Sequence, residues 1–415
     1  MKPESLMMSY GYKPSLSEGA IKCPIFQTST FVFNTALEGK RFFEVAYGLR
    51  EKDQDEEMGL IYSRLNNPDL EILEDRLCLW DGAEECAVFE SGMSAISTAM
   101  MEFMKPGDLL LYSKPVYGGT DHFINHFLKK LQISSVGFRA DETKEEIIKK
   151  IEETGLGHKL SMIHIETPAN PTNAIIDIEM CAEIKKHFET TENPIVFSVD
   201  NTYMGPVWQH PLKHGADLVL YSATKYIGGH SDVIAGACLG SKELMGRVKG
   251  LRTFLGNMAG PWTGWLLMRS LETLKVRMDQ QAKNAKYVAE FLNAHPLVES
   301  VFYLGNAAVN GTKKERELIA KQYKSYGAMI AFDIKGGEKE AFCFLDNLKL
   351  IKLAVSLGGT ESLAEHPQTM THADVDPEDK VAMNITEKLI RLSIGVENYD
   401  DLISDLKSAF DQINH

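Results

Sequence analysis

Between residues 61 and 260, short apolar runs alternate regularly with longer amphipathic stretches. The apolar runs are CAVFE (86–90), DLLLYS (108–113), SMIHIE (161–166), PIVFSVD (194–200) and DLVLYS (217–222). The stretches between them, such as SAISTAMMEFM (94–104) and EMCAEIKKHFE (179–189), carry apolar residues at helical spacing. This alternation of strands and helices predicts an α/β fold with a mostly parallel sheet covered by helices.

After residue 260 the pattern changes. The segment 263–295 has helical spacing throughout, and the apolar runs VESVFYL, GAMIAFDIKGG and LKLAVSLGG then mix strands with helices. A chain of 415 residues is also too long for one ordinary core. We therefore expect an N-terminal arm over residues 1–60, an α/β domain over 61–260 and a smaller α+β domain over 261–415.

Bulk composition excludes several classes of protein. The net charge of −14 argues against nucleic-acid binding, which needs basic surface. No run approaches the roughly 20 apolar residues of a membrane span, and the N-terminus lacks the apolar core of a signal peptide. The 6 cysteines are scattered and none has a histidine at metal-ligand spacing, so we expect no metal site and a cytoplasmic location.

Polar residues follow the predicted strands at the points where these strands end. They are Ser91-Gly92-Met93, Tyr117-Gly118-Gly119, Glu166 to Asn170, Asp200-Asn201 and Ser222 to Lys225. In an open α/β sheet, ligands bind beyond the carboxyl ends of the strands. The sequence therefore predicts one site built from all five segments.

Lys225 is the residue of this set with the most distinctive chemistry. It follows a buried-looking strand between small residues, which makes it a candidate for a Schiff base, although most lysines are surface residues. A lysine imine stabilises a carbanion only with an electron sink, and pyridoxal 5′-phosphate (PLP) is such a sink. Asp200 could keep the pyridine nitrogen of PLP protonated, although an aspartate at a strand end is also an ordinary turn residue.

Other residues could hold the rest of such a cofactor and its substrate. Ser91-Gly92-Met93 begins a predicted helix, whose free amides suit a phosphate, although serine is also an ordinary N-cap. Ser222 and Thr224 could add hydroxyls, and the ring of Tyr117 could lie over the pyridine. Arg391 could bind a substrate carboxylate through two hydrogen bonds, although it also fits a surface ion pair.

The motifs as a set resemble one family. They are YSRLNNP (62–68), FESGMSAI (89–96), VYGGT (116–120), ETPANPT (166–172), VDNTY (199–203), YSATKYIGGHSDVIAG (221–236), SLGGTESLAEHPQTMTH (356–372) and RLSIGVE (391–397). From about residue 10 to the C-terminus the chain resembles the γ-family (Cys/Met metabolism) of fold-type I PLP enzymes. The resemblance implies a seven-stranded central sheet and PLP bound to Lys225.

The resemblance also implies a role for each matching residue. Lys225 would carry the cofactor and move protons, Asp200 would pair with the pyridine nitrogen, and Tyr117 would stack on the ring and act at the γ-carbon. The phosphate would be bound by Gly92, Met93, Ser222 and Thr224, and by Tyr62 and Arg64 of a neighbouring subunit. Ser356 and Arg391 would hold the substrate carboxylate, while Glu166 and Asn170 line the site. The family usually assembles as a homotetramer of two dimers.

Members of this family differ in the reaction at the γ-carbon. Val355 precedes the substrate serine, where enzymes that use cystathionine resemble one another in carrying glutamate. An apolar residue there suits the thioether of methionine, because the distal charged group of cystathionine would have no partner beside it. We therefore expect a methionine γ-lyase, with cystathionine γ-synthase, O-acyl-homoserine sulfhydrylase and cystathionine γ-lyase as alternatives.

Three features depart from the methionine γ-lyase pattern. Gly119 stands where many bacterial enzymes have cysteine, LRTFLG (251–256) stands where they tend to have a Lys-Asp pair, and the segment around 40–59 is longer than usual. Two other classes fit worse. A nicotinamide dehydrogenase would need GxGxxG after a strand, and a non-catalytic scaffold would be expected to have lost Lys225 or Asp200.

Overall fold

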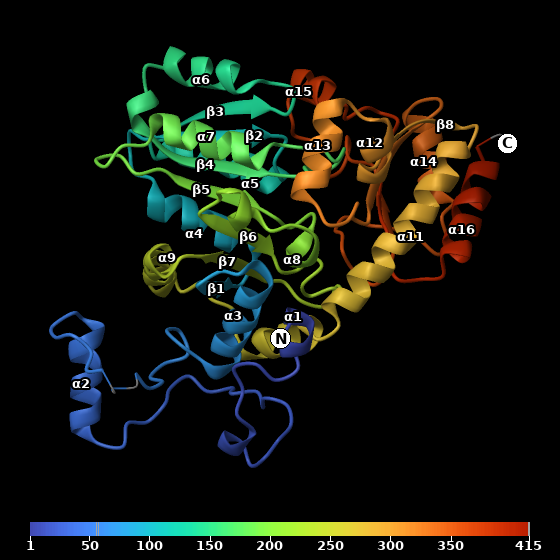
Figure 1. The fold of residues 1–415 in the computed structure, drawn as a ribbon. Coiled ribbons are helices and arrows are strands. Elements are labelled where there is room, and N and C mark those ends of the chain that lie inside the picture. The colour runs from blue at the N-terminus through green and yellow to red at the C-terminus, as the bar shows by residue number, and fades with distance from the viewer. Residues whose placement is uncertain (55, 57, 414–415) are drawn as a thin grey trace.

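The computed structural model describes residues 1–54, 56 and 58–413. A seven-stranded sheet of order β1-β7-β6-β5-β4-β2-β3 forms its centre (Figure 1). Its strands are β1 Glu85–Phe89, β2 Leu109–Lys114, β3 Ser134–Arg139, β4 Leu160–Glu166, β5 Val196–Asp200, β6 Leu218–Ser222 and β7 Gly236–Gly240.

Most neighbouring strands of this sheet run parallel. Strands β3, β2, β4, β5 and β6 pair in parallel, whereas β7 is antiparallel to both β6 and β1. The prediction of a mostly parallel α/β sheet is confirmed. Strands β3 and β7 were not among the expected runs, because SSVGFR and GACLG contain few large apolar residues.

Helices cover both faces of the seven-stranded sheet (Figure 1). The α-helices of the chain are α1 Pro3–Leu6, α2 Ala36–Ala46, α3 Pro68–Asp81, α4 Gly92–Phe103, α5 Gly118–His122, α6 Lys144–Glu153, α7 Ile178–Phe188, α8 Gly205–Trp208, α9 Lys242–Leu255, α10 Pro261–Leu271, α11 Leu274–Ala294, α12 Leu304–Asn310, α13 Lys313–Gln322, α14 Glu338–Asp346, α15 Pro377–Ala382 and α16 Tyr399–Asp411. Short 3-10 or π turns are η1 Pro14–Leu16, η2 Phe123–Leu128, η3 Gly157–Lys159 and η4 Pro211–His214. Ile147 of α6 and Ile184 of α7 pack in one apolar cluster, while Met100 of α4 and Met245 of α9 pack in another.

A five-stranded sheet of order β10-β11-β12-β9-β8 forms the second centre of the fold. Its strands are β8 Val298–Phe302, β9 Met329–Ile334, β10 Lys352–Leu353, β11 Leu363–Glu365 and β12 Leu389–Ser393. Helices α11, α14 and α16 pack beside it, as expected for an α+β arrangement (Figure 1). The domain limits near residues 60 and 260 stay our proposal.

The helix expected over 263–295 is two helices, α10 and α11. The carbonyl oxygen of Ser270 accepts hydrogen bonds from the Thr273 amide at 3.2 Å and from Nη2 of Arg277 at 3.1 Å. These bonds replace the continuing helical pattern and end α10. Helical spacing continues across the break, so the sequence pattern did not reveal it.

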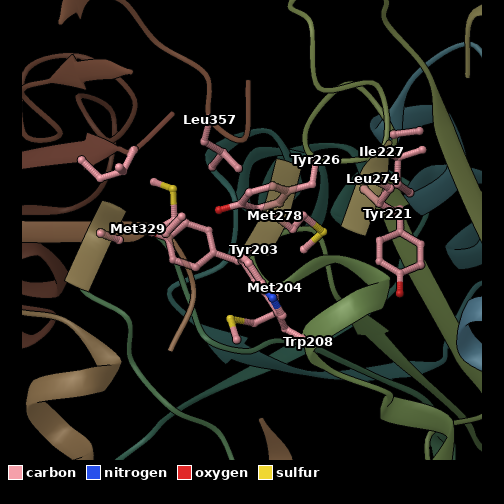
Figure 2. Close-up of a cluster of buried hydrophobic side chains, with 14 of the residues drawn as sticks. Tyr203, Met204, Trp208, Tyr221, Tyr226, Ile227, Leu274, Met278, Met329 and Leu357 are labelled. Atoms are coloured by element: carbon pink, nitrogen blue, oxygen red, sulfur yellow. The ribbon is translucent and has the colours of Figure 1, made fainter. Parts of the chain in front are cut away.

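An apolar cluster packs between the two sheets (Figure 2). Tyr226, directly after Lys225, is buried there and meets the Trp208 ring edge-on, with 5.4 Å between ring centroids. Leu274 and Met278 bring the start of α11 into the same cluster. This packing holds the backbone next to Lys225 against the second sheet.

The N-terminal segment up to residue 60 contributes little to either core. Helix α1 lies beside α3, whereas α2 projects away from the body of the protein (Figure 1). Val32, Leu37 and Tyr47 are exposed on this projecting part. No helix in the described part of the chain is both long and apolar enough to cross a membrane.

Candidate active site

A cavity of about 300 Å³ lies where the strands of the seven-stranded sheet end and the second sheet approaches. Its lining includes the predicted residues Gly92, Met93, Tyr117, Glu166, Asn170, Asp200, Ser222, Thr224, Lys225, Val355, Ser356 and Arg391. The structure therefore brings these side chains together, although their individual roles stay predictions.

Lys225 lies in a tight turn after β6. The amide of Gly229 donates to the Lys225 carbonyl at 2.7 Å, and a Cβ at Gly229 would lie 1.8 Å from Nη1 of Arg277. Nζ of Lys225 donates to Oγ of Ser356 at 2.8 Å. Burial, together with the positive charge of Arg391, lowers the pKa of Lys225 to about 8. The amine therefore loses its proton, and becomes nucleophilic, at a lower pH than an ordinary lysine does.

Two buried carboxylates face the cavity from neighbouring strands. Asp200 ends β5 and Glu166 ends β4, and the two residues are partners in the strand register. Glu166 accepts hydrogen bonds from the amides of Tyr117 at 2.7 Å and Asn170 at 3.1 Å. Burial and the nearby Asp200 carboxylate raise the pKa of Glu166, because two adjacent buried negative charges repel each other.

The start of α4 forms a place for an anion. Oγ of Ser91 caps the helix by accepting from the Ser94 amide at 3.0 Å. The amides of Gly92 and Met93 lie in the first turn, where the helix itself supplies no acceptors. A Cβ at Gly92 would lie 2.8 Å from Cβ of Ser222, so glycine allows the helix to approach β6 closely.

The residues present fit PLP. Free amides at α4 and the hydroxyls of Ser222 and Thr224 provide donors for a phosphate. Two further side chains in the cavity suit the cofactor ring: the acid of Asp200 suits a pyridine nitrogen, and the amine of Lys225 suits an aldehyde carbon.

Ser356 and Arg391 enter the cavity from the C-terminal part of the chain. Nη2 of Arg391 donates to the Ser356 carbonyl at 2.5 Å, and Nη1 donates to Oδ1 of Asn170 at 3.0 Å. Ser356 has a φ of 116°, a left-handed conformation that non-glycine residues rarely adopt. This strained turn directs its carbonyl toward Arg391 and its hydroxyl toward Lys225, as strained residues at functional sites often do.

The mouth of the cavity is open and largely apolar. Tyr117, Val355 and Ile234 line it, with 47%, 55% and 69% of their surface exposed. The predicted phosphate residues Tyr62 and Arg64 are not among its lining residues. Instead, Nη1 of Arg64 donates to the Thr253 carbonyl of its own chain at 2.6 Å.

The sequence analysis missed several residues of the site. Thr202 lines the cavity and its Oγ1 accepts from the Ser222 amide at 2.7 Å. Its position directly after Asp200-Asn201 was a usable signal. Ile234 and Thr371 also line the cavity, and both stand within quoted motifs, but nothing in the local pattern distinguishes them from their neighbours.

The whole chain resembles known proteins. The profile of the family described as "Cys/Met metabolism PLP-dependent enzyme" matches residues 4–411. An L-methionine gamma-lyase of Fusobacterium nucleatum subsp. polymorphum is 39% identical over 397 residues, which are 95% of this chain and 94% of that protein. A human cystathionine gamma-lyase is 41% identical over 355 residues, which are 85% and 83% of the two chains.

Solved structures show the same relationship. The crystal structure of cystathionine gamma synthase from Xanthomonas oryzae pv. oryzae in complex with aminoacrylate and cysteine has a TM-score of 0.86 and 32% identity, and the match covers 100% of this chain and 99% of that one. The family profile, the relatives and the fold agree with the motifs and with the PLP-compatible cavity. The chain therefore belongs to the Cys/Met metabolism family of fold-type I enzymes, which depend on pyridoxal 5′-phosphate.

Proposed function

We propose that this enzyme is a methionine γ-lyase, which converts methionine and water into methanethiol, 2-oxobutanoate and ammonia. The observation that carries this choice is the apolar mouth of the cavity at Val355 and Ile234. Glu166 and Asp200 are the only carboxylates among the described residues that line this cavity, and both lie at the strand ends. A distal ammonium group would therefore be unpaired, whereas a methyl thioether would be well accommodated.

The chain's own residues would hold the cofactor at three points. The amides of Gly92 and Met93, with Ser222 and Thr224, would bind its phosphate. Asp200 would keep the pyridine nitrogen protonated. When bound, PLP withdraws electrons from the substrate carbon that bears the amino group.

Two side chains would move protons. Nζ of Lys225 would take the proton from the α-carbon, and its lowered pKa suits this role because a neutral amine is a base. The hydroxyl of Tyr117, at the exposed mouth, would donate a proton to the departing thiolate sulfur. Arg391 and Ser356 would orient the substrate by its carboxylate.

A second candidate is γ-replacement, by a cystathionine γ-synthase or an O-acyl-homoserine sulfhydrylase. The similarity to a structure of cystathionine gamma synthase over the full chain favours it. Cystathionine γ-lyase is the third candidate, supported by the human relative. These enzymes share the cofactor site, so the cofactor site cannot distinguish them.

One assay distinguishes the three candidates. The purified holoenzyme is incubated separately with methionine, with cystathionine, and with O-acyl-homoserine plus sulfide. Thiol and 2-oxobutanoate are measured in each reaction. Methionine should have the highest kcat/KM, and a higher value for either alternative would overturn our proposal.

We also propose that each active site is shared across a dimer, within a tetramer. Tyr62 and Arg64 match the family's phosphate motif, yet they do not line the cavity of their own chain. A partner's arm would supply them and would cover the exposed mouth. We further propose a cytoplasmic location, because all six cysteines are free thiols, as is typical of a reducing compartment.

A further inference from the structure

Glu365 is a buried acid behind the substrate side of the active site. In the antiparallel pairing of β11 with β12 it lies directly opposite Arg391. Its Oε1 is 2.8 Å from Nη1 of Arg391, and the two side chains are 0% and 3% exposed. Directly opposite residues share one face of a sheet, so the strand register itself produces this ion pair.

The hydrogen bonds of Arg391 divide its guanidinium into two sides. Nη1 donates to Oδ1 of Asn170 at 3.0 Å and forms the ion pair with Oε1 of Glu365. Nη2 donates one hydrogen to the Ser356 carbonyl, and Nε is buried without an acceptor among the described residues. Nε and Nη2 lie on the same edge of the guanidinium plane. That edge is one of the two that can bind a carboxylate through parallel hydrogen bonds.

Glu365 is itself held in place. Oγ1 of Thr371, which lines the cavity, donates to Oε1 of Glu365 at 2.8 Å. Because that hydroxyl has one hydrogen, Nδ1 of His372, 2.9 Å away, must donate to Thr371. Burial lowers the pKa of His372 to about 4, so the ring is neutral and can carry its hydrogen on Nδ1.

We propose that Glu365 is a positioning residue: it holds Nη1 of Arg391 so that the Nε and Nη2 edge faces the substrate carboxylate. Thr371 and His372 support it from behind. The inference deepens the proposed function, because it takes Arg391 as the carboxylate partner. It does not depend on which sulfur amino acid the enzyme cleaves.

The test compares two probes that differ only in the carboxylate. Norleucine has the shape of methionine but no γ-leaving group, and pentylamine is the same molecule without the carboxylate. Their binding to the holoenzyme is followed by the change in cofactor absorbance. The variants are Glu365→Leu, which removes the acceptor, and Glu365→Gln, which keeps it. Glu361→Gln, in the same segment but outside the cavity lining, is the matched control.

Glu365→Leu should weaken norleucine binding at least about tenfold, which is about 1.4 kcal/mol. Pentylamine binding should stay unchanged in both Glu365 variants. Glu365→Gln should bind norleucine at least as well as the native enzyme. The side-chain oxygen that faces Thr371 and Nη1 of Arg391 remains, and the Glu365 charge that competes with the substrate carboxylate for Arg391 is gone. Unchanged norleucine binding in Glu365→Leu, or equal losses for both probes, would overturn the proposal.

A second pair of variants covers the case in which Glu365→Leu fails to fold. Thr371→Val removes the hydroxyl that holds Glu365, whereas Thr371→Ser keeps it. Thr371→Val should weaken norleucine but not pentylamine, and Thr371→Ser should restore norleucine binding; any other pattern would contradict the proposal. Turnover of methionine does not enter these measurements, so a wrong substrate assignment would leave their result interpretable.

Discussion

Lys225 combines two properties that a cofactor-carrying lysine needs. Its Nζ is held by Oγ of Ser356 at 2.8 Å, and burial lowers its pKa to about 8. The hydrogen bond to Ser356 orients the amine, and the lowered pKa makes it a better nucleophile. Both depend on residues far away in the sequence.

Lys225→Ala should abolish turnover and the covalent link to PLP. The cofactor should then leave on dialysis, because only its noncovalent contacts would remain. Borohydride reduction followed by mass spectrometry of the peptides would show the cofactor on Lys225 in the native enzyme alone. Lys213→Ala, which changes a lysine outside the cavity lining, should keep both activity and label. Full activity of Lys225→Ala would exclude Lys225 as the attachment site.

We predict that Val355, at the apolar mouth of the cavity, sets the preference for methionine over cystathionine. Val355→Glu should shift the ratio of kcat/KM for cystathionine over methionine upward by about one to two orders of magnitude. A charge-assisted contact is worth about 1.5–3 kcal/mol, which is the source of this range. Val355→Gln introduces a side chain with the shape of glutamate but without its charge, and it should shift the ratio much less. Equal shifts in both variants would show that size, and not charge, controls the choice.

At the scale of elements, a buried polar contact joins α3 to the sheet next to the site. Asp81 ends α3, and both of its oxygens lie 2.9 Å from the hydroxyl of Tyr221 in β6. That hydroxyl also accepts a hydrogen bond from Nδ2 of Asn201 at 2.8 Å, and Asn201 directly follows Asp200. Burial raises the pKa of Asp81 to about 7.

This pKa predicts a pH dependence of stability. Between about pH 4 and pH 7 the folded state keeps Asp81 protonated while the unfolded state ionises it, so the folded state binds more protons. The contribution of Asp81 to the free energy of unfolding is full below about pH 4 and is lost as the pH rises to about 7. The free energy of unfolding falls by up to about 1.4 kcal/mol per pH unit in this range. Asp81→Asn should remove this slope, which thermal unfolding at several pH values would reveal. An identical pH profile for the native and variant proteins would show that Asp81 does not titrate in this range.

At the scale of the whole molecule, the site lies where two sheets meet. Asp200 ends a strand of the seven-stranded sheet and Lys225 follows one, whereas Arg391 belongs to the five-stranded sheet. The apolar cluster around Tyr226 and Met278 joins these two parts (Figure 2). A change in that packing would move the substrate residues relative to the cofactor residues.

The proposed sharing of sites between subunits has a direct test. Arg64→Ala and Lys225→Ala should each be inactive or strongly impaired alone. When the two are unfolded and refolded together, each mixed dimer should contain one site with both native residues. Random mixing should then restore about a quarter of native activity. No recovery, with refolding of the native enzyme as a control, would place Arg64 at the site of its own chain.

The sequence by itself determined the residues at the strand ends. Strand and helix periodicity are local properties, so the positions of Asp200, Lys225 and the start of α4 followed from counting along the chain. The motifs around them carried the family and its cofactor. Nine of the twelve predicted residues in the cavity lie at or just after strand ends of the seven-stranded sheet, and they meet because the carboxyl ends of these strands share one edge. Val355, Ser356 and Arg391 reach the cavity from the C-terminal part of the chain.

Only the tertiary structure decided what depends on contacts between distant segments. The break between α10 and α11 arises from the bonds of Arg277, and the pairing of Glu365 with Arg391 arises from strand register. The lowered pKa of Lys225 depends on burial and on Arg391, neither of which is encoded near the lysine. Such effects are set by distances in space, which local periodicity does not contain.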